Sequence, residues 1–125
     1  MSTARVKRSH KLISANKVEG TRVFNKTGKR VGRIDDLMID KVLGTVTYAI
    51  MSFDGFLGMG EKHHPIPWSM LTYDVERDGY CVDVTEEQLH GAPSFDRTQP
   101  VNYSGDALYD LIHKHYEIPP AWGNL

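Results

Sequence analysis

The chain has 125 residues, a formal net charge of −1 and an apolar share of 40%. This length favours one domain with an extension, and the composition excludes wholesale disorder and a surface built throughout for nucleic acid. Cys81 is the single cysteine, so no internal disulfide can form, which fits a reducing compartment. The sequence contains no apolar run long enough for a signal peptide or a membrane span, and we therefore expect a cytoplasmic protein.

Residues 1–17 form a basic arm. Five cationic residues precede the first acid, Glu19: Arg5, Lys7, Arg8, Lys11 and Lys17. Such an arm can bind RNA or an acidic membrane surface, or it can simply be a solvated terminus. The second interpretation is favoured, because no aromatic residues alternate with the charges to stack on bases.

Residues 20–40 predict a β-hairpin from which the rest of the sheet is built. Its turn lies at 25–29, where Gly28 can supply the positive φ that such turns need. Gly32, just inside the second strand, indicates a bulge or the close approach of another backbone. A further bulge near 35–36 would place three apolar residues on one face: Ile34, Leu37 and Ile39. A strand bent in this way suits a small barrel.

Two polar pairs invite a chemical interpretation: Asp35 with Asp36, and His63 with His64. Neighbours on a strand point to opposite faces, and no third metal ligand lies at useful spacing. We therefore expect solvated carboxylates at a bulge or edge, a solvated strand entrance at the histidines, and no metal or cofactor. Cys81 has no histidine nearby in the sequence and is expected to be an inert thiol.

Residues 45–53 are apolar on both faces, which predicts a central strand or one whose outer face meets another element or a partner chain. The glycine-rich loop 54–61 carries Phe56, Leu57 and Met59. It is not a phosphate-binding loop, because the lysine-serine/threonine ending and the following helix are missing. Its apolar residues either touch a partner or cap the open end of the barrel, and both interpretations stay open.

The segments that follow predict the remaining strands. The prolines at 65 and 67 indicate an extended segment at a sheet edge, and Trp68 anchors the turn after it. Residues 70–76 alternate, so that three side chains should face inward: Leu71, Tyr73 and Val75. A turn at 77–79 leads to the return strand, whose inward residues are Tyr80, Val82 and Val84.

Two helices are expected near the end of the chain. Thr85 is a candidate N-cap of a short helix that ends at Gly91. Residues 104–116 predict a second helix. Its apolar stripe comprises Leu108, Leu111, Ile112 and His115, and Tyr109 and Tyr116 lie nearby.

Four stretches in a fixed order carry a family resemblance: GTRVFNKTGKRVGRIDDLMID, then GTVTYAI, then FLGMGEKHHPIPWSML, then TEEQLHGAPSF. Together they resemble the PRC-barrel domain, the small module of the photosynthetic reaction-centre H subunit and of a ribosome-maturation factor. The resemblance implies a six-stranded barrel that binds proteins and has no shared catalytic residues. The chain has neither the transmembrane helix of the first relative nor the N-terminal barrel of the second. It looks more like the free-standing bacterial members of the family.

The predicted fold is mainly β: a small six-stranded PRC-type β-barrel with a short helix after the last strand and a C-terminal helical extension. We expect a basic arm at 1–17, the barrel at 18–95 and the extension at 96–125. The predicted function is a non-catalytic, self-associating interaction module, a homodimer for example, and not an enzyme. The alternative is an accessory factor in RNA or ribosome metabolism that acts through the arm. The expected contact residues are Phe56, Leu57, Met59, Trp68, Tyr109, Tyr116 and Trp122.

Overall fold

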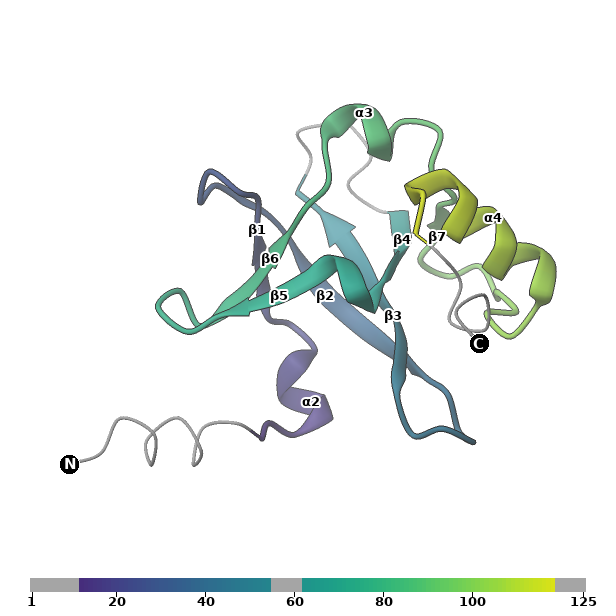
Figure 1. The fold of residues 1–125 in the computed structure, drawn as a ribbon, viewed down its shortest axis with the longest axis horizontal. Helices are drawn as coiled ribbons and strands as arrows, with labels where there is room; N and C mark the ends of the chain where they lie inside the picture. Colours follow the sequence, from purple (N-terminus) through teal and green to yellow (C-terminus); the bar gives the residue numbers. More distant parts are fainter. Residues whose placement is uncertain (1–11, 55–61, 119–125) are drawn as a thin grey trace.

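The computed structural model describes residues 12–54 and 62–118 (Figure 1). Strands dominate this part of the chain, and the longer helix follows them. In chain order the elements are α2 (Ala15–Val18), β1 (Arg22–Phe24), β2 (Arg30–Ile39), β3 (Val46–Phe53), β4 (Lys62–Pro67), the 3-10 turn η2 (Trp68–Met70), β5 (Leu71–Asp74), β6 (Gly79–Val82), α3 (Glu86–Leu89), β7 (Phe95–Asp96) and α4 (Asp106–Tyr116).

The strands form one sheet in the order β5-β6-β1-β2-β3-β4-β7. Neighbours are antiparallel except β1 and β6, which run parallel. This mainly β sheet followed by a helix confirms the predicted fold class. The six expected strands are β1 to β6, and β7 adds a two-residue strand that pairs with Lys62 and His63 alone. The proline part of β4 therefore has a strand neighbour only on the β3 side, as its prolines predict.

The first hairpin forms as predicted, because its turn residues match the backbone they adopt. The side-chain oxygen of Asn25 accepts hydrogen bonds from the backbone N–H groups of Thr27 and Lys29. Gly28 has a φ of 91°, which costs a glycine little. Gly32 lies where the backbone of β3 passes so closely that a Cβ atom would stand 2.2 Å from the carbonyl oxygen of Ser52. The predicted close approach at Gly32 is confirmed.

Strand β2 bends at the predicted bulge. Ile34 pairs with Met51 and Asp36 pairs with Ile50, so Asp35 is the extra residue. Ile34 is buried and Leu37 packs against the core, as expected. The expectation for Ile39 is wrong, since its side chain is 51% exposed. A second register shift, between Met38 and Ile39, turns the end of the strand away from the core.

Strand β3 is covered on both faces, as its composition predicts. Alternate side chains such as Ala49 and Met51 face one way and Tyr48 faces the other, and all three are buried. The Tyr48 ring lies 6.2 Å from the rings of both Tyr109 and His113, which belong to α4. The element that covers this face of β3 is therefore the C-terminal helix of the same chain, which lies beside β4 and β7 in Figure 1.

The predicted stripe of α4 needs correction. Leu111 is exposed, whereas Ile112, His113 and Tyr116 are buried. The buried face includes a histidine because stacking and hydrogen bonding accommodate its ring. The His113 ring stacks on Tyr109 with centroids 3.9 Å apart, and its Nδ1 lies 2.9 Å from the Tyr109 carbonyl oxygen. The Tyr109 and His113 rings also lie beside Tyr48 of β3, so this side of the helix faces the sheet and Leu111 faces solvent.

The hairpin of β5 and β6 is also shorter than its alternation predicts. Leu71 faces the core, but Tyr73 is exposed and Val75 is 77% exposed, so both were wrongly expected to face inward. Val75 is exposed because Asp74 Oδ1 accepts from the backbone N–H groups of Glu76 and Arg77, so that β5 ends at Asp74 and Val75 lies in the turn. Tyr73 lies in β5, and its hydroxyl donates to Asp78 Oδ1 at that turn. Tyr80 and Val82 are buried as predicted.

Helix α3 begins as predicted. The Thr85 hydroxyl accepts from the Gln88 backbone N–H, and the Gln88 side chain accepts from the Thr85 backbone N–H. This reciprocal capping box satisfies two backbone donors that have no partner within the helix. Gly91 follows the helix with a φ of 79°, the expected stop signal.

Gly32→Ala is expected to destabilise the protein by about 3 kcal/mol, because the new methyl group would collide with backbone rather than with a movable side chain. Urea unfolding measures this loss. Gly105→Ala is the matched control, since its Cβ would meet its nearest neighbour at an ordinary 3.5 Å, and it should cost about 1 kcal/mol or less. Equal effects of the two variants would contradict the close approach of β2 and β3.

Candidate interaction surfaces

Four of the seven expected contact residues lie outside the described residues: Phe56, Leu57, Met59 and Trp122. The structure places the other three in different surroundings. Trp68 is half-buried beside Tyr80, with ring centroids 5.3 Å apart. Tyr109 is half-buried under the stacked ring of His113, and Tyr116 lies in the core. These three side chains do not form one exposed aromatic patch, and their role in partner binding stays a prediction.

An exposed apolar pair, which sequence reasoning missed, marks the turn between β2 and β3. We call Val42 and Leu43 the hairpin knob; they are 92% and 70% exposed. Asp40 Oδ1 accepts hydrogen bonds from the backbone N–H groups of both residues, and the Asp40 carbonyl accepts from Gly44. The knob is therefore held in one turn conformation. The sequence does indicate this pair, because Val42 and Leu43 stand in a short turn where polar residues are usual.

A cleft of about 270 Å³ opens at the other end of β2, between the β1–β2 turn and α3. We call it the mouth cleft. Its wall includes four apolar residues: Val31, Phe53, Val84 and Leu89. Its rim is charged, and one rim pair, Lys26 and Asp83, forms an ion pair at 3.1 Å. The cleft is slightly smaller than the roughly 300–1,000 Å³ of most small-molecule sites. Val31, Phe53 and Leu89 are buried, so they offer it little accessible apolar surface.

Asp35, the bulge residue, is the centre of a polar cluster that joins three strands. Its carboxylate accepts from Arg33 Nε at 2.7 Å and from the Ser52 hydroxyl, and it lies 3.1 Å from His63 Nε2. Burial by itself raises the pKa of Asp35, but the hydrogen bonds from Ser52 and Arg33 outweigh burial and lower it. Asp35 was expected to be solvated, and this expectation is wrong because the bulge turns its carboxylate towards β3 and β4. Asp36 is exposed, as expected.

This cluster differs in its order of groups from a serine nucleophile with its base. In such a site the imidazole stands next to the hydroxyl and the carboxylate lies behind the imidazole. Here the carboxylate of Asp35 lies between Ser52 and His63. The arrangement therefore holds the extra residue of the bulge against its neighbouring strands.

His64 also departs from the expectation of a solvated strand entrance. Its side chain is fully buried, edge-on against Phe53 with ring centroids 5.2 Å apart. Neither ring nitrogen has a hydrogen-bond partner of normal geometry among the described residues. Burial lowers the pKa of His64 to about 4, and the Lys62 backbone offsets this only in part. The imidazole is neutral near pH 7, which makes it tolerable in the core.

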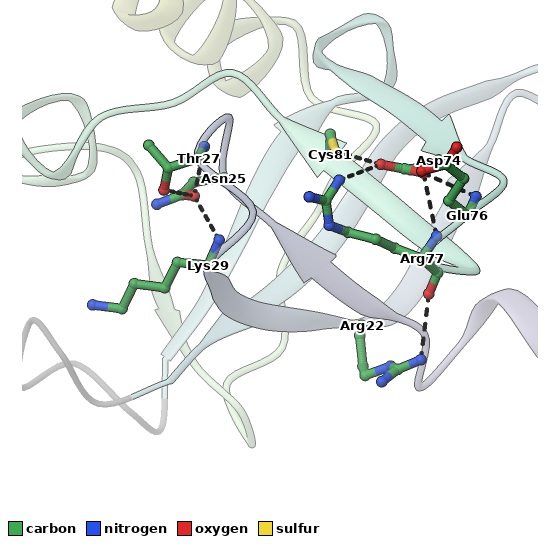
Figure 2. A network of polar contacts seen from close by, with 8 residues as sticks. All are labelled: Arg22, Asn25, Thr27, Lys29, Asp74, Glu76, Arg77 and Cys81. Atoms are coloured by element: carbon green, nitrogen blue, oxygen red, sulfur yellow. Dashed lines mark hydrogen bonds and ion pairs between the residues drawn. The ribbon is translucent and has the colours of Figure 1, made fainter.

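Polar side chains of the β5–β6 hairpin contact one another and Arg22 of β1 (Figure 2). The guanidinium groups of Arg22 and Arg77 each lie 5.8 Å from the centroid of the Phe24 ring. Arg77 Nη1 also donates to Asp74 Oδ2 at 2.6 Å, and this bond lowers the pKa of Asp74. Cys81 is a free thiol whose Sγ lies 3.8 Å from the same carboxylate oxygen. Both arginines are thus engaged by their own chain.

A comparison with protein families identifies the family to which this sheet and its first hairpin belong. Residues 10–89, more than half of the chain, match the family model of the PRC-barrel domain.

The chain belongs to the PRC-barrel domain family.

PRC-barrel domains mediate protein interactions and act as general assembly modules. The matched residues end at α3, so β7 and α4 are additions that follow the matched part of the PRC-barrel. A search of curated proteins found no match to the chain. Over residues 12–54 and 62–118, no group of three or more His, Cys, Asp or Glu side chains comes together at metal-binding distance. Within the same ranges, no helix has the length and apolar character to cross a membrane.

The buried His64 predicts a loss of stability in acid. Its folded-state pKa of about 4 lies below the ordinary value of 6.5, so the unfolded chain takes up the proton first. The contribution of neutral, buried His64 to the free energy of unfolding is fully present above pH 6.5. It is lost as the pH drops from 6.5 towards 4. Between pH 7.5 and pH 4.5 the histidine should remove about 2 to 3 kcal/mol.

Urea unfolding of His64→Leu at these two pH values measures this contribution. The variant should lose less stability in acid than the parent protein by about 2 to 3 kcal/mol. His90→Leu is the control, since His90 is exposed, and it should keep the parent's acid loss. If His64→Leu loses as much stability between pH 7.5 and pH 4.5 as the parent protein does, His64 is not a neutral, buried imidazole in the folded protein.

Proposed function

We propose that this PRC-barrel is a non-catalytic protein-interaction module that associates with itself, as in a homodimer, in the cytoplasm. The observation that carries the proposal is the hairpin knob: Val42 and Leu43 project into solvent on a turn held by Asp40. Exposed apolar groups at a protruding turn add nothing to the stability of the single chain. They become favourable when a partner covers them.

The energetics of the knob suit a binding contact. Fully burying a side chain of this size contributes about 1.5–3 kcal/mol. Asp40 holds the turn before any partner arrives, so little conformational entropy is lost on binding. A short, rigid, apolar projection is the kind of group that dominates an interface when it enters a complementary hollow.

The polar side chains support a non-catalytic role, because the most concentrated groups serve the fold. Asp35 ties the bulge of β2 to Arg33, Ser52 and His63. Arg77 ties the β5–β6 turn to Asp74 and to the ring of Phe24. The free Cys81 is consistent with the reducing environment of the cytoplasm.

Other surfaces remain candidates for partner contact. Trp68 and Tyr109 are half-buried, so part of each ring faces solvent. Phe56, Leu57, Met59 and Trp122 stay predictions from the sequence. Tyr116 stays one as well, although its place in the core favours a structural role.

An accessory role in RNA or ribosome metabolism is the alternative, and the basic arm at 1–17 supports it. Binding of this kind releases counterions, so it weakens steeply as salt rises. Association through the apolar knob should depend little on salt. A pull-down at low and moderate salt, with and without nuclease, therefore separates the two roles.

The double variant Val42→Ser/Leu43→Ser tests the proposal. The parent protein should show a molar mass that rises with concentration in light scattering, whereas the variant should stay monomeric. Val75→Ser is the matched control, because Val75 is equally solvent-exposed but lies in the β5–β6 turn. Thermal unfolding should differ little among the three proteins, since the altered side chains touch solvent. If the double variant associates as the parent does, the knob is not the contact.

A further inference from the structure

We propose that the outer face of β3 and β4 is a helix-binding site, which α4 occupies in the free protein and from which a partner's helix displaces it. The partner helix carries aromatic or aliphatic side chains at positions i, i+3, i+4 and i+7. This inference goes beyond the proposed self-association, which uses the hairpin knob in the β2–β3 turn.

The first argument is the apolar face itself. Partners in an antiparallel pair share a face, and Tyr48 pairs with Pro67 while Ile50 pairs with Pro65. All four side chains are fully buried. They lie on the side that α4 covers, since the Tyr48 ring lies beside two rings of α4. The PRC-barrel match covers 10–89, so chain that follows the matched domain covers this face.

The second argument is the pattern of the helix that lies there. The side chains that α4 directs towards the barrel are Tyr109, Ile112, His113 and Tyr116. They stand at i, i+3, i+4 and i+7, which places them on one face of a helix. An amphipathic helix binds the groove of another protein through the same spacing. The docked helix therefore shows which side chains this face accepts.

The third argument is that the docking of α4 is imperfect. The hydroxyl groups of Tyr48 and Tyr116 are buried and have no hydrogen-bond partner among the described residues. Release of the helix would let water bond both hydroxyls. Glu117, the C-cap, has a φ of 57°, a left-handed conformation that is unfavourable for residues other than glycine. Because of these features, less free energy is needed to release α4 than to open the sheet.

The fourth argument is the connection between α4 and the barrel. The two residues of β7 pair only with Lys62 and His63. Residues 97–105 then lead to α4 without a helix or strand, and their side chains are exposed or half-buried. Nine residues can extend over about 30 Å. The connector therefore lets α4 leave the face while every strand of the barrel stays paired.

A labelled peptide with the sequence of residues 104–118 tests the site when it is added to the full chain. Fluorescence anisotropy should show weak binding to the parent, because α4 occupies the face. Ile112→Ala in the protein loosens α4 and should tighten peptide binding at least tenfold. Leu111→Ala is the matched control, since Leu111 is exposed on the same helix, and it should bind as the parent does. Tyr109→Ala is a second loosening variant, so the test holds if Ile112→Ala does not fold.

One further variant of the protein should act in the opposite direction. Tyr116→Phe removes a buried hydroxyl that has no partner among the described residues, so it should hold α4 more firmly. Peptide binding to this variant should be at least twofold weaker than to the parent. Stronger binding would show that the Tyr116 hydroxyl helps to hold α4 in place, which contradicts the imperfect docking.

Two altered peptides test the pattern that the face accepts. The first keeps Tyr109, Ile112, His113 and Tyr116 and replaces the other residues with Ala, Lys and Glu. It should bind the Ile112→Ala protein within about threefold of the natural sequence, because the face contacts only the four retained positions. The second peptide carries Ile112→Asp and should not bind. Equal binding of the Ile112→Asp peptide would overturn the inference.

Hydrogen exchange followed by mass spectrometry tests the release of α4 without any peptide. Amides of 106–116 should exchange at least tenfold faster than those of 46–53, and Ile112→Ala should accelerate only the first group. If both groups exchange together, α4 opens only with the whole fold and the inference is overturned. Peptide binding that Ile112→Ala and Tyr109→Ala leave unchanged overturns it as well.

The test is separate from that of self-association. The knob variant Val42→Ser/Leu43→Ser should bind the peptide as the parent does, because the knob lies in the β2–β3 turn and not under α4. A parent that stays monomeric while the loosened variants bind the peptide would overturn the proposed self-association and support the helix-binding site.

Discussion

Strand β2 pairs with β1 near its start and with β3 along its length, and one straight strand cannot follow both neighbours. Two local features allow it to bend. Gly32 lets the β3 backbone approach where a Cβ atom would collide, and the extra residue Asp35 shifts the register by one. The rest of the fold depends on this bend, because it brings the inner faces of β2, β3 and β4 around the same core.

The bend also determines where polar groups go. A bulge leaves polar groups without the partners that a regular ladder would give them. The carboxylate of Asp35 finds partners in Arg33, Ser52 and His63. At β1 and the β5–β6 turn, Arg22 and Arg77 lie over the ring of Phe24. Clusters that invite a chemical interpretation in the sequence are thus used to hold strands together.

Helix α4 adds a further layer to the matched PRC-barrel. Its stacked Tyr109 and His113 rings lie over Tyr48, which fills the face of β3 that would otherwise be exposed. An apolar sheet face can be covered by the same chain or by a partner, and here the same chain covers it. Among the described residues, Val42 and Leu43 remain exposed at the β2–β3 turn.

The sequence by itself determined strands β1 to β6, the β1–β2 turn, the bulge in β2 and the N-cap of α3 at Thr85. These features depend on residues close together in the sequence, such as Asn25 with Lys29 or Thr85 with Gln88. Only the tertiary structure decided that His64 is buried, that Asp35 binds Ser52, and that α4 turns His113 inward instead of Leu111. Those outcomes depend on which strands and helices meet across long stretches of chain. Periodicity assigns a side chain to a face, but it does not say what stands opposite that face.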